Sequence, residues 1–402
     1  MNPVDDLMPS LEQGVYPFSY LSSAPPLHAA SPYPLLRVLL SLSAEMECAE
    51  TAARCLSDLS SQEAKRTIAL ISRADARQAA SLSAWLSEEK DSEILALYYA
   101  LLTLELAASM AQRMGDGPVR RALDFFIPEY LDELYRIANL LYLRGTESAQ
   151  TLLHGFAEIM PGRPLIACHR HPFDCVSGPV SVPSLWEKMA LFLLSAAEKE
   201  KRRHALYLSG TARDTLSGAF FAEVSLLSQQ HLTRFSALQP PQSPLERLFL
   251  SEYAACYLYD SSVQLCSSQD LKAFAREERD HELSHLRKIC CLLEREQSMK
   301  KTLPAFPPPL SLGPNKGYVR DTLQNLGVTA LREGYAPVGT LPRGADFFRW
   351  QKRLCPDPAS VPSHRIIQAV IEKYGADYRF EIAPHPVEAL RVRTRDHTDL
   401  GR

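Results

Sequence analysis

The sequence of 402 residues lacks the features that mark several large classes of protein. Its nine cysteines form no Cys-x-x-Cys pair and are odd in number, which argues against a disulfide scaffold and for a reducing compartment. Glycine is scarce, at 17 residues, and no Walker loop, dinucleotide-binding glycine motif or nucleophile elbow is present. With 44 basic and 47 acidic residues, the chain carries no charge excess that would attract nucleic acid, so we expect no nucleic-acid partner.

Long apolar runs and a secretory signal are also lacking. The first six residues carry two aspartates and no basic residue, and no basic region followed by an apolar one begins the chain. The longest apolar stretch, from Ile94 to Leu104, is shorter than the roughly 20 residues that cross a bilayer. We therefore expect a soluble, cytoplasmic protein without a membrane partner.

What the sequence does contain is helical periodicity. Between clusters of proline, apolar residues recur at intervals of three and four, which is typical of helices with one buried face. Ser243 and Glu246 flank Pro244 as a capping box with proline at the first helical position. The predicted helices cover residues 35–58, 62–87, 91–113, 122–143, 184–208, 216–238, 244–265 and 269–296, with another at 364–374 and short strands at 378–382 and 390–393.

Polar residues on the buried faces of these helices carry the chemistry. Glu278, Glu282 and His285 share one helical face with apolar residues, and Glu252 and His231 lie in apolar stripes of other predicted helices. Buried carboxylates need a compensating partner, and a metal ion is one of the few that serves. The alternatives are a structural salt bridge for Glu252 and the Glu282–His285 pair, and a hydrogen bond to a carbonyl for His231.

A common spacing relates these residues. Glu252 and Glu282 are 30 residues apart, as are Glu198 and Ser228, and His231 follows Ser228 as His285 follows Glu282. Turn-forming residues occur at the midpoints, so residues of two antiparallel helices can lie at one height. We predict one layer of a four-helix bundle over residues 184–296. Glu198 lies in a run of charged residues that normally faces solvent, so its inward placement depends on this spacing alone.

A lone glutamate from each of two helices and Glu-x-x-His from each of the other two form the ligand set of ferritin-like di-iron or di-manganese carboxylate proteins, which these residues resemble. The run from Gln230 to Leu238, with Glu252 and Glu282-Leu-Ser-His285, looks like uncharacterised bacterial members of that superfamily. The resemblance implies a ferritin-like bundle with Glu198, His231, Glu252, Glu282 and His285 as ligands. Ser228 replaces one glutamate of the pattern. Either water, Gln229 or Glu278 fills this gap, or the site holds a single metal ion or none.

Other parts of the chain carry weaker signals. In the N-terminal half, Glu45, Asp75 and Glu105 repeat the spacing of 30, but Asp75 and Gln78 replace Glu and His, so we predict a degenerate bundle without a full metal site. His169 and His171, flanked by Cys168 and Cys175, are a separate candidate for zinc, or an ordered loop without metal.

The resulting fold class is mainly α. We divide the chain into an N-terminal extension (1–34), a degenerate helical bundle (35–145), a connecting loop (146–183), a ferritin-like metal-binding bundle (184–298), and a proline-rich linker with a mixed tail (299–402).

The resemblance implies two iron ions, or iron and manganese, that activate dioxygen to oxidise a small organic substrate. The alternative is a non-catalytic scaffold that holds metal or binds a partner. We leave a homodimer open.

Overall fold

The computed structural model of the chain describes residues 32–86, 92–146, 149–153, 155–157, 183–240, 242–299, 303–326 and 361–374. Within these ranges the protein is helical and contains no strand. The expected fold class, mainly α, is confirmed. The expected strands at 378–382 and 390–393 lie outside the described residues, as does the loop with His169 and His171.

Eight long helices form four helical hairpins. They are α2 (Tyr33–Cys55) with α3 (Gln62–Leu86), α4 (Ser92–Ala111) with α5 (Pro118–Leu143), α7 (Leu185–Thr211) with α8 (Thr215–Leu238), and α9 (Pro244–Leu265) with α10 (Gln269–Gln297). All eight helices were predicted, with ends within a few residues. The capping box of α9 is confirmed, since Ser243 accepts from the Glu246 amide and Glu246 accepts from the Ser243 amide.

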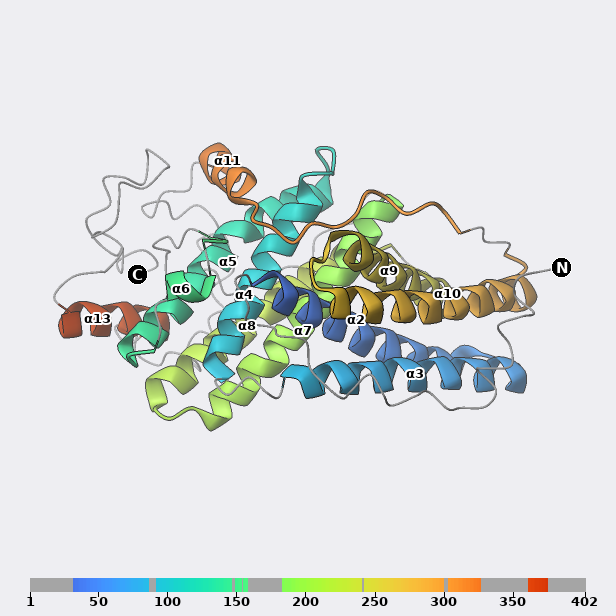
Figure 1. The fold of residues 1–402 in the computed structure, drawn as a ribbon, viewed down its shortest axis with the longest axis horizontal. Helices are drawn as coiled ribbons and strands as arrows, with labels where there is room; N and C mark the ends of the chain where they lie inside the picture. Colours follow the sequence, from blue (N-terminus) through green and yellow to red (C-terminus); the bar gives the residue numbers. More distant parts are fainter. Residues whose placement is uncertain are drawn as a thin grey trace, which may run out of the picture.

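The hairpins pack in two four-helix bundles, but not in chain order. The first bundle contains α2, α3, α9 and α10, and the second contains α4, α5, α7 and α8. They lie toward opposite ends of the molecule (Figure 1). We had expected residues 35–145 and 184–298 to form separate bundles. The structure instead combines one hairpin from each segment in each bundle.

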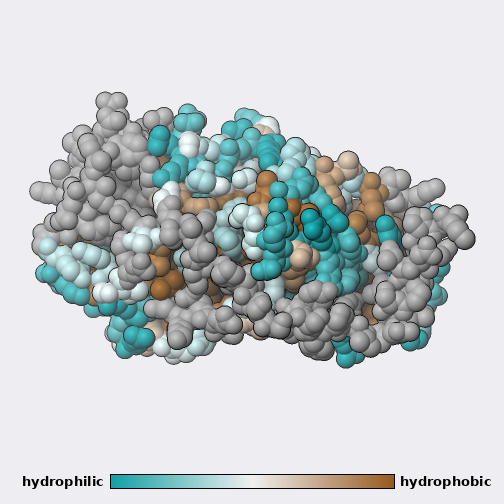
Figure 2. Space-filling model, in the orientation of Figure 1, coloured by the Kyte–Doolittle hydropathy of each residue, from teal (hydrophilic) through white to brown (hydrophobic). Residues whose placement is uncertain are grey.

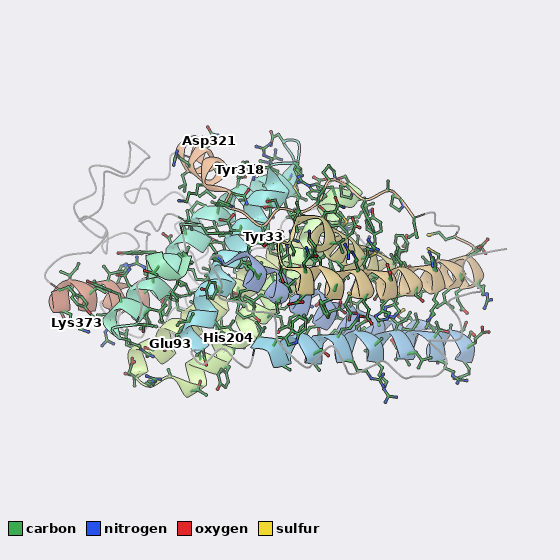
Figure 3. The ribbon with its side chains drawn as sticks, viewed as in Figure 1. Tyr33, Glu93, His204, Tyr318, Asp321 and Lys373 are labelled. Carbon is green, nitrogen blue, oxygen red and sulfur yellow. The ribbon has the colours of Figure 1, made fainter. Side chains whose placement is uncertain are left out.

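Contacts between α2 and α7 join the two bundles. Every residue of α2 from Leu35 to Glu45 is buried, and α4 is buried along almost its whole length. By length and composition α4 is apolar enough to cross a membrane, but 89% of its most apolar window is buried inside the protein. On α7, the His204 ring nitrogen lies 2.6 Å from the Ser92 carbonyl at the start of α4 (Figure 3).

Shorter elements cover these bundles. Helix α6 (Ala149–Leu153) follows α5, while α11 (Lys316–Leu326) and α13 (Pro362–Tyr374) pack on α5, and α13 also packs on α8. Helix α13 confirms the prediction for 364–374; α6 and α11 were missed. Side chains of hydrophilic residues cover much of the visible outer face, with hydrophobic residues showing between them (Figure 2).

The proline-rich segment runs across the outside of both bundles without helical structure (Figure 1). Tyr257 donates to the Pro308 carbonyl at 2.8 Å, and the Leu310 amide donates to Ser261 at 3.0 Å. At its far end, the Asn315 amide donates to the buried Glu105 carboxylate at 3.0 Å. The segment is therefore bound along its length to the helices it crosses.

Candidate metal centre

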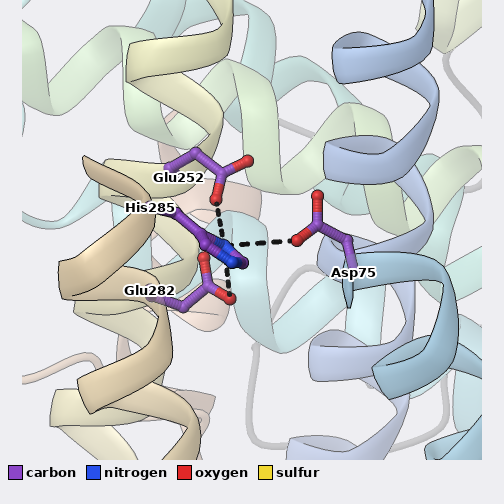
Figure 4. Close-up of side chains that lie close together, drawn as sticks. All are labelled: Asp75, Glu252, Glu282 and His285. Carbon is purple, nitrogen blue, oxygen red and sulfur yellow. Dashed lines mark hydrogen bonds and ion pairs between the residues drawn. The ribbon is translucent and has the colours of Figure 1, made fainter. Parts of the chain in front are cut away.

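Four buried side chains meet in the interior of the first bundle. Asp75 comes from α3, Glu252 from α9, and Glu282 and His285 from α10 (Figure 4). One ligand atom from each lies within 4.8 Å of the others, and this group can hold a metal ion. We call these four residues the Asp75 centre.

Local sequence explains why the four side chains point inward. On α3, Asp75 lies four residues after buried Ile71 and four before buried Ala79, in the stripe that faces the bundle. On α10, Glu282 and His285 continue the stripe of Leu271 and Ala275. Since a helix places residues three and four apart on one face, packing the apolar stripes also buries the acids.

The His285 ring holds the centre together. Its Nδ1 lies 3.1 Å from Glu252 Oε2, 3.4 Å from Asp75 Oδ1 and 3.7 Å from Glu282 Oε1. One ring nitrogen carries at most one proton, so Nδ1 can donate a hydrogen bond to only one of the three surrounding carboxylates. The shortest distance assigns that bond to Glu252.

Several carboxylate oxygens in and beside the centre therefore lack a hydrogen bond. Both oxygens of Asp75, both of Glu282, Oε1 of Glu252 and Oε2 of Glu45 are buried without a hydrogen-bond partner among the described residues. Each unsatisfied buried polar group costs about 1–3 kcal/mol, and more when it is charged. A cation bound between the carboxylates would remove this cost.

The pKa values show the same excess of negative charge. Burial raises the pKa of Glu282 well above its usual range, and the neighbouring Glu45 and Glu252 carboxylates raise it further. Burial also raises the pKa of Asp75, with a further increase from Glu252. Burial alone would lower the pKa of His285, but its hydrogen bond to Glu252 and the charge of Asp75 raise it.

A second group of polar side chains adjoins the centre. Glu45 of α2 is fully buried, and its Oε1 accepts a hydrogen bond of 2.6 Å from Tyr259. Gln78 of α3 donates to Glu278, which also lies 3.2 Å from His281. Burial raises the pKa of Glu45 well above its usual range. The hydrogen bond from Tyr259 lowers this pKa in part, and the charge of Glu278 raises it further. The carboxylates of Glu45 and Glu278 thus interact electrostatically beside the Asp75 centre.

Of the five ligands expected from the sequence, the structure brings three together: Glu252, Glu282 and His285. Glu198 and His231 lie in the second bundle, where His231 Nδ1 is 3.0 Å from Glu198 Oε1. The single layer of six residues is therefore divided between two bundles. The physical reason is that a common spacing of 30 sets residue heights within each hairpin but not which hairpins pack together.

Asp75 and Glu45, rather than Glu198 and His231, lie in the first bundle with Glu252, Glu282 and His285. Both belong to the N-terminal spacing of 30, which we interpreted as degenerate because aspartate and glutamine replace glutamate and histidine. Ser228, the apparent gap in the ligand set, is buried on α8 in the second bundle and leaves no gap in the Asp75 centre. The signal that identifies Asp75 is its place in an otherwise apolar stripe.

Comparisons with known proteins add no relative to these observations. No family model matches the chain, and neither a curated protein nor a solved structure is significantly similar to it.

Proposed function

We propose that this protein is a ferritin-like metalloprotein that binds iron, or iron and manganese, at the Asp75 centre. Its proposed activity is the oxidation of a small organic substrate by dioxygen. The observation that carries the proposal is the group of buried carboxylate oxygens without hydrogen-bond donors around one histidine. Carboxylate and imidazole ligands suit iron and manganese, with zinc as the competing ion.

The distribution of donors over the first bundle supports a ferritin-like relationship. In that superfamily two helices each supply a glutamate and two supply Glu-x-x-His. Here α2 and α9 supply Glu45 and Glu252, and α10 supplies Glu282-x-x-His285. Helix α3 departs from the pattern with Asp75 followed by Gln78.

Asp75, Glu252, Glu282 and His285 would hold one ion. The resemblance to di-iron proteins implies a second ion, for which Glu45 and Glu278 are the neighbouring carboxylates. Gln78 takes the place of a second histidine, and its buried Oε1 has no hydrogen-bond partner among the described residues. The second position would therefore have oxygen donors alone and hold its ion more weakly than the first.

Bound reduced iron would supply the electrons that activate dioxygen. The chain's own residues bind and shield the metal. The Tyr259 hydroxyl holds Glu45 in place through its hydrogen bond, and the apolar faces of the four helices exclude bulk water. Among the described residues we assign none as a general acid or base.

The alternative function is a non-catalytic scaffold that holds metal. The complete burial of the centre favours it, since Asp75, Glu252 and Glu282 are 0% exposed and His285 is 2% exposed. The two functions differ in their reaction with dioxygen rather than in metal content. An oxidase consumes oxygen when its reduced metal is exposed to air, whereas a scaffold that shields its ion does so far more slowly.

The test begins with anaerobic loading of purified protein with ferrous iron, followed by metal analysis. We expect about two ions per chain in the wild type and a large loss in Glu252→Ala and His285→Ala. Glu294→Ala, an exposed substitution on the same helix as His285, is the matched control. No bound iron above trace would reject the metal centre.

An oxygen electrode then separates the two functions. Oxygen consumed in proportion to bound iron, within seconds of mixing, supports the oxidase. Bound iron that stays reduced in air for hours supports the scaffold.

A further inference from the structure

The second bundle contains its own buried group of carboxylates around a histidine. His231 of α8 lies with Nδ1 3.0 Å from Glu198 of α7 and Nε2 2.7 Å from Glu129 of α5. The Lys201 ammonium of α7 donates to Glu133 at 2.8 Å and to Glu198 at 3.1 Å. All five residues are at most 2% exposed. We call them the His231 cluster.

The His231 cluster corresponds in sequence to the Asp75 centre. Glu198 precedes Glu252 by 54 residues, and His231 precedes His285 by the same number. The glutamate and the histidine of each pair are therefore 33 residues apart. Both pairs make the same contact, from His Nδ1 to the glutamate, at 3.0 Å and 3.1 Å. The hairpins α7–α8 and α9–α10 therefore contain the same glutamate–histidine contact at corresponding positions.

Lysine marks the difference between the two copies. The same step of 54 residues relates Lys201 to Ala255, which is buried and offers no charge. It also relates Ser228 to Glu282. The Asp75 centre thus has the methyl group of Ala255 and the carboxylate of Glu282. The His231 cluster has an ammonium group and a hydroxyl group at the corresponding positions.

Two carboxylate oxygens contact the Lys201 ammonium and one of them adjoins the His231 ring, and these are ligand types that suit a metal ion. Glu133 Oε2 and Glu198 Oε1 contact the ammonium, and His231 Nδ1 contacts the same Glu198 oxygen. The other ring nitrogen of His231 faces Glu129, as in metal sites where a carboxylate holds the far nitrogen of a ligating histidine. In addition, Glu133 Oε1 and Ser228 Oγ are buried without hydrogen-bond partners among the described residues.

We propose that Glu133, Glu198 and His231 form a second site for a divalent transition metal, which Lys201 keeps closed by placing its ammonium group where the ion would bind. Glu129 orients His231 in this site. The wild-type protein then binds metal in its first bundle alone, and the charge of Lys201 fixes that stoichiometry. Removal of the ammonium opens the second site.

The test is a Lys201→Ala variant, stripped of metal and titrated with Co²⁺, whose visible absorption reports its ligands. We expect one more Co²⁺ per chain than in the wild type. The additional ion should disappear in Lys201→Ala/His231→Ala and remain in Lys201→Ala/His285→Ala. Lys201→Arg keeps a cation and should bind no additional ion. A Lys201→Ala protein that folds and binds no more Co²⁺ than the wild type overturns the proposal.

Loss of the ammonium leaves buried carboxylates unpaired, so the metal-free variant should unfold at a lower temperature than the wild type. Co²⁺ should restore its melting temperature, and should do so with His285→Ala present as well. A Lys201→Ala chain that stays unfolded when refolded with Co²⁺ also overturns the proposal, because the ion would then not replace the ammonium. The result does not depend on the proposed function: a wild type without metal would reject that function, while an additional ion in Lys201→Ala would still establish the second site.

Discussion

Neutralising one carboxylate of the Asp75 centre should stabilise the metal-free protein while it abolishes metal binding. Glu282→Gln is the most informative change, because neither Glu282 oxygen has a hydrogen-bond partner among the described residues. Glutamine keeps the shape of the side chain and adds two donors. These donors would face Glu252 and Asp75, whose carboxylates have unpaired oxygens.

The magnitude follows from the proton that Glu282 must carry. Because burial and nearby carboxylates raise its pKa, folded metal-free protein retains a proton that the unfolded chain releases above its ordinary pKa of about 4.3. Holding that proton above the ordinary pKa lowers the stability of the folded protein, and this cost grows by about 1.36 kcal/mol per pH unit. Burial of the glutamine amide offsets part of this gain. We expect Glu282→Gln to raise the free energy of unfolding by about 1–3 kcal/mol at pH 7.

Urea unfolding at several pH values is the assay. Without metal, the advantage of Glu282→Gln should be largest near pH 7 and vanish near pH 4, since stability held by a raised carboxyl pKa is lost as pH rises. With metal at 1,000 times its dissociation constant, the wild type should gain about 4 kcal/mol and the variant almost nothing. Glu294→Gln, exposed on the same helix, should change neither. A metal-free Glu282→Gln protein less stable than the wild type would refute the reasoning, because Glu282 would then be a structural partner.

Three further substitutions test contacts outside the four ligands. Burial raises the pKa of Glu105 to about 7, so the free energy of unfolding of the wild type should fall by about 3 kcal/mol as pH rises from 4.5 to 7. Glu105→Gln should not show this fall, and a pH profile equal to that of the wild type would contradict the prediction. Tyr259→Phe leaves Glu45 without its 2.6 Å donor and should lower the metal-free free energy of unfolding by about 1–3 kcal/mol, with a smaller loss when metal is bound. Ser363→Ala removes the 3.0 Å hydrogen bond from α13 to Glu223 and should speed proteolysis of α13 while metal content stays unchanged; equal cleavage rates would show that this bond does not hold the helix.

Local features of this fold could be predicted from sequence, and the packing of its hairpins could not. Helical periodicity and capping identify the eight long helices, and apolar stripes identify Glu252, Glu282 and His285 as inward-facing. The equal spacing of 30 in the hairpins α2–α3, α7–α8 and α9–α10 gives each the same internal register, so several pairings of hairpins look equally consistent. Pairing the hairpins adjacent in sequence, α7–α8 with α9–α10, wrongly puts Glu198 and His231 in one bundle with Glu252, Glu282 and His285.

The nearly continuous apolar sequence of α2 from Leu35 to Leu42 is a feature that could have indicated the true pairing. A helix with one buried face belongs at the edge of a bundle, whereas residues 35–45 of α2 are buried on every side. Such a helix needs neighbours from both bundles. Asp75 was discounted for its residue type, although an aspartate supplies the same carboxylate oxygens as a glutamate.

Metal content of Asp75→Ala, compared with that of His231→Gln, tests the central claim most directly. Both proteins and the wild type would be loaded anaerobically with ferrous iron and assayed for bound iron per chain. We predict that Asp75→Ala loses most of its iron, because α3 supplies a ligand to the centre in the first bundle. His231→Gln should keep the wild-type content. Iron lost from His231→Gln and retained by Asp75→Ala would contradict the assignment of the metal to the first bundle.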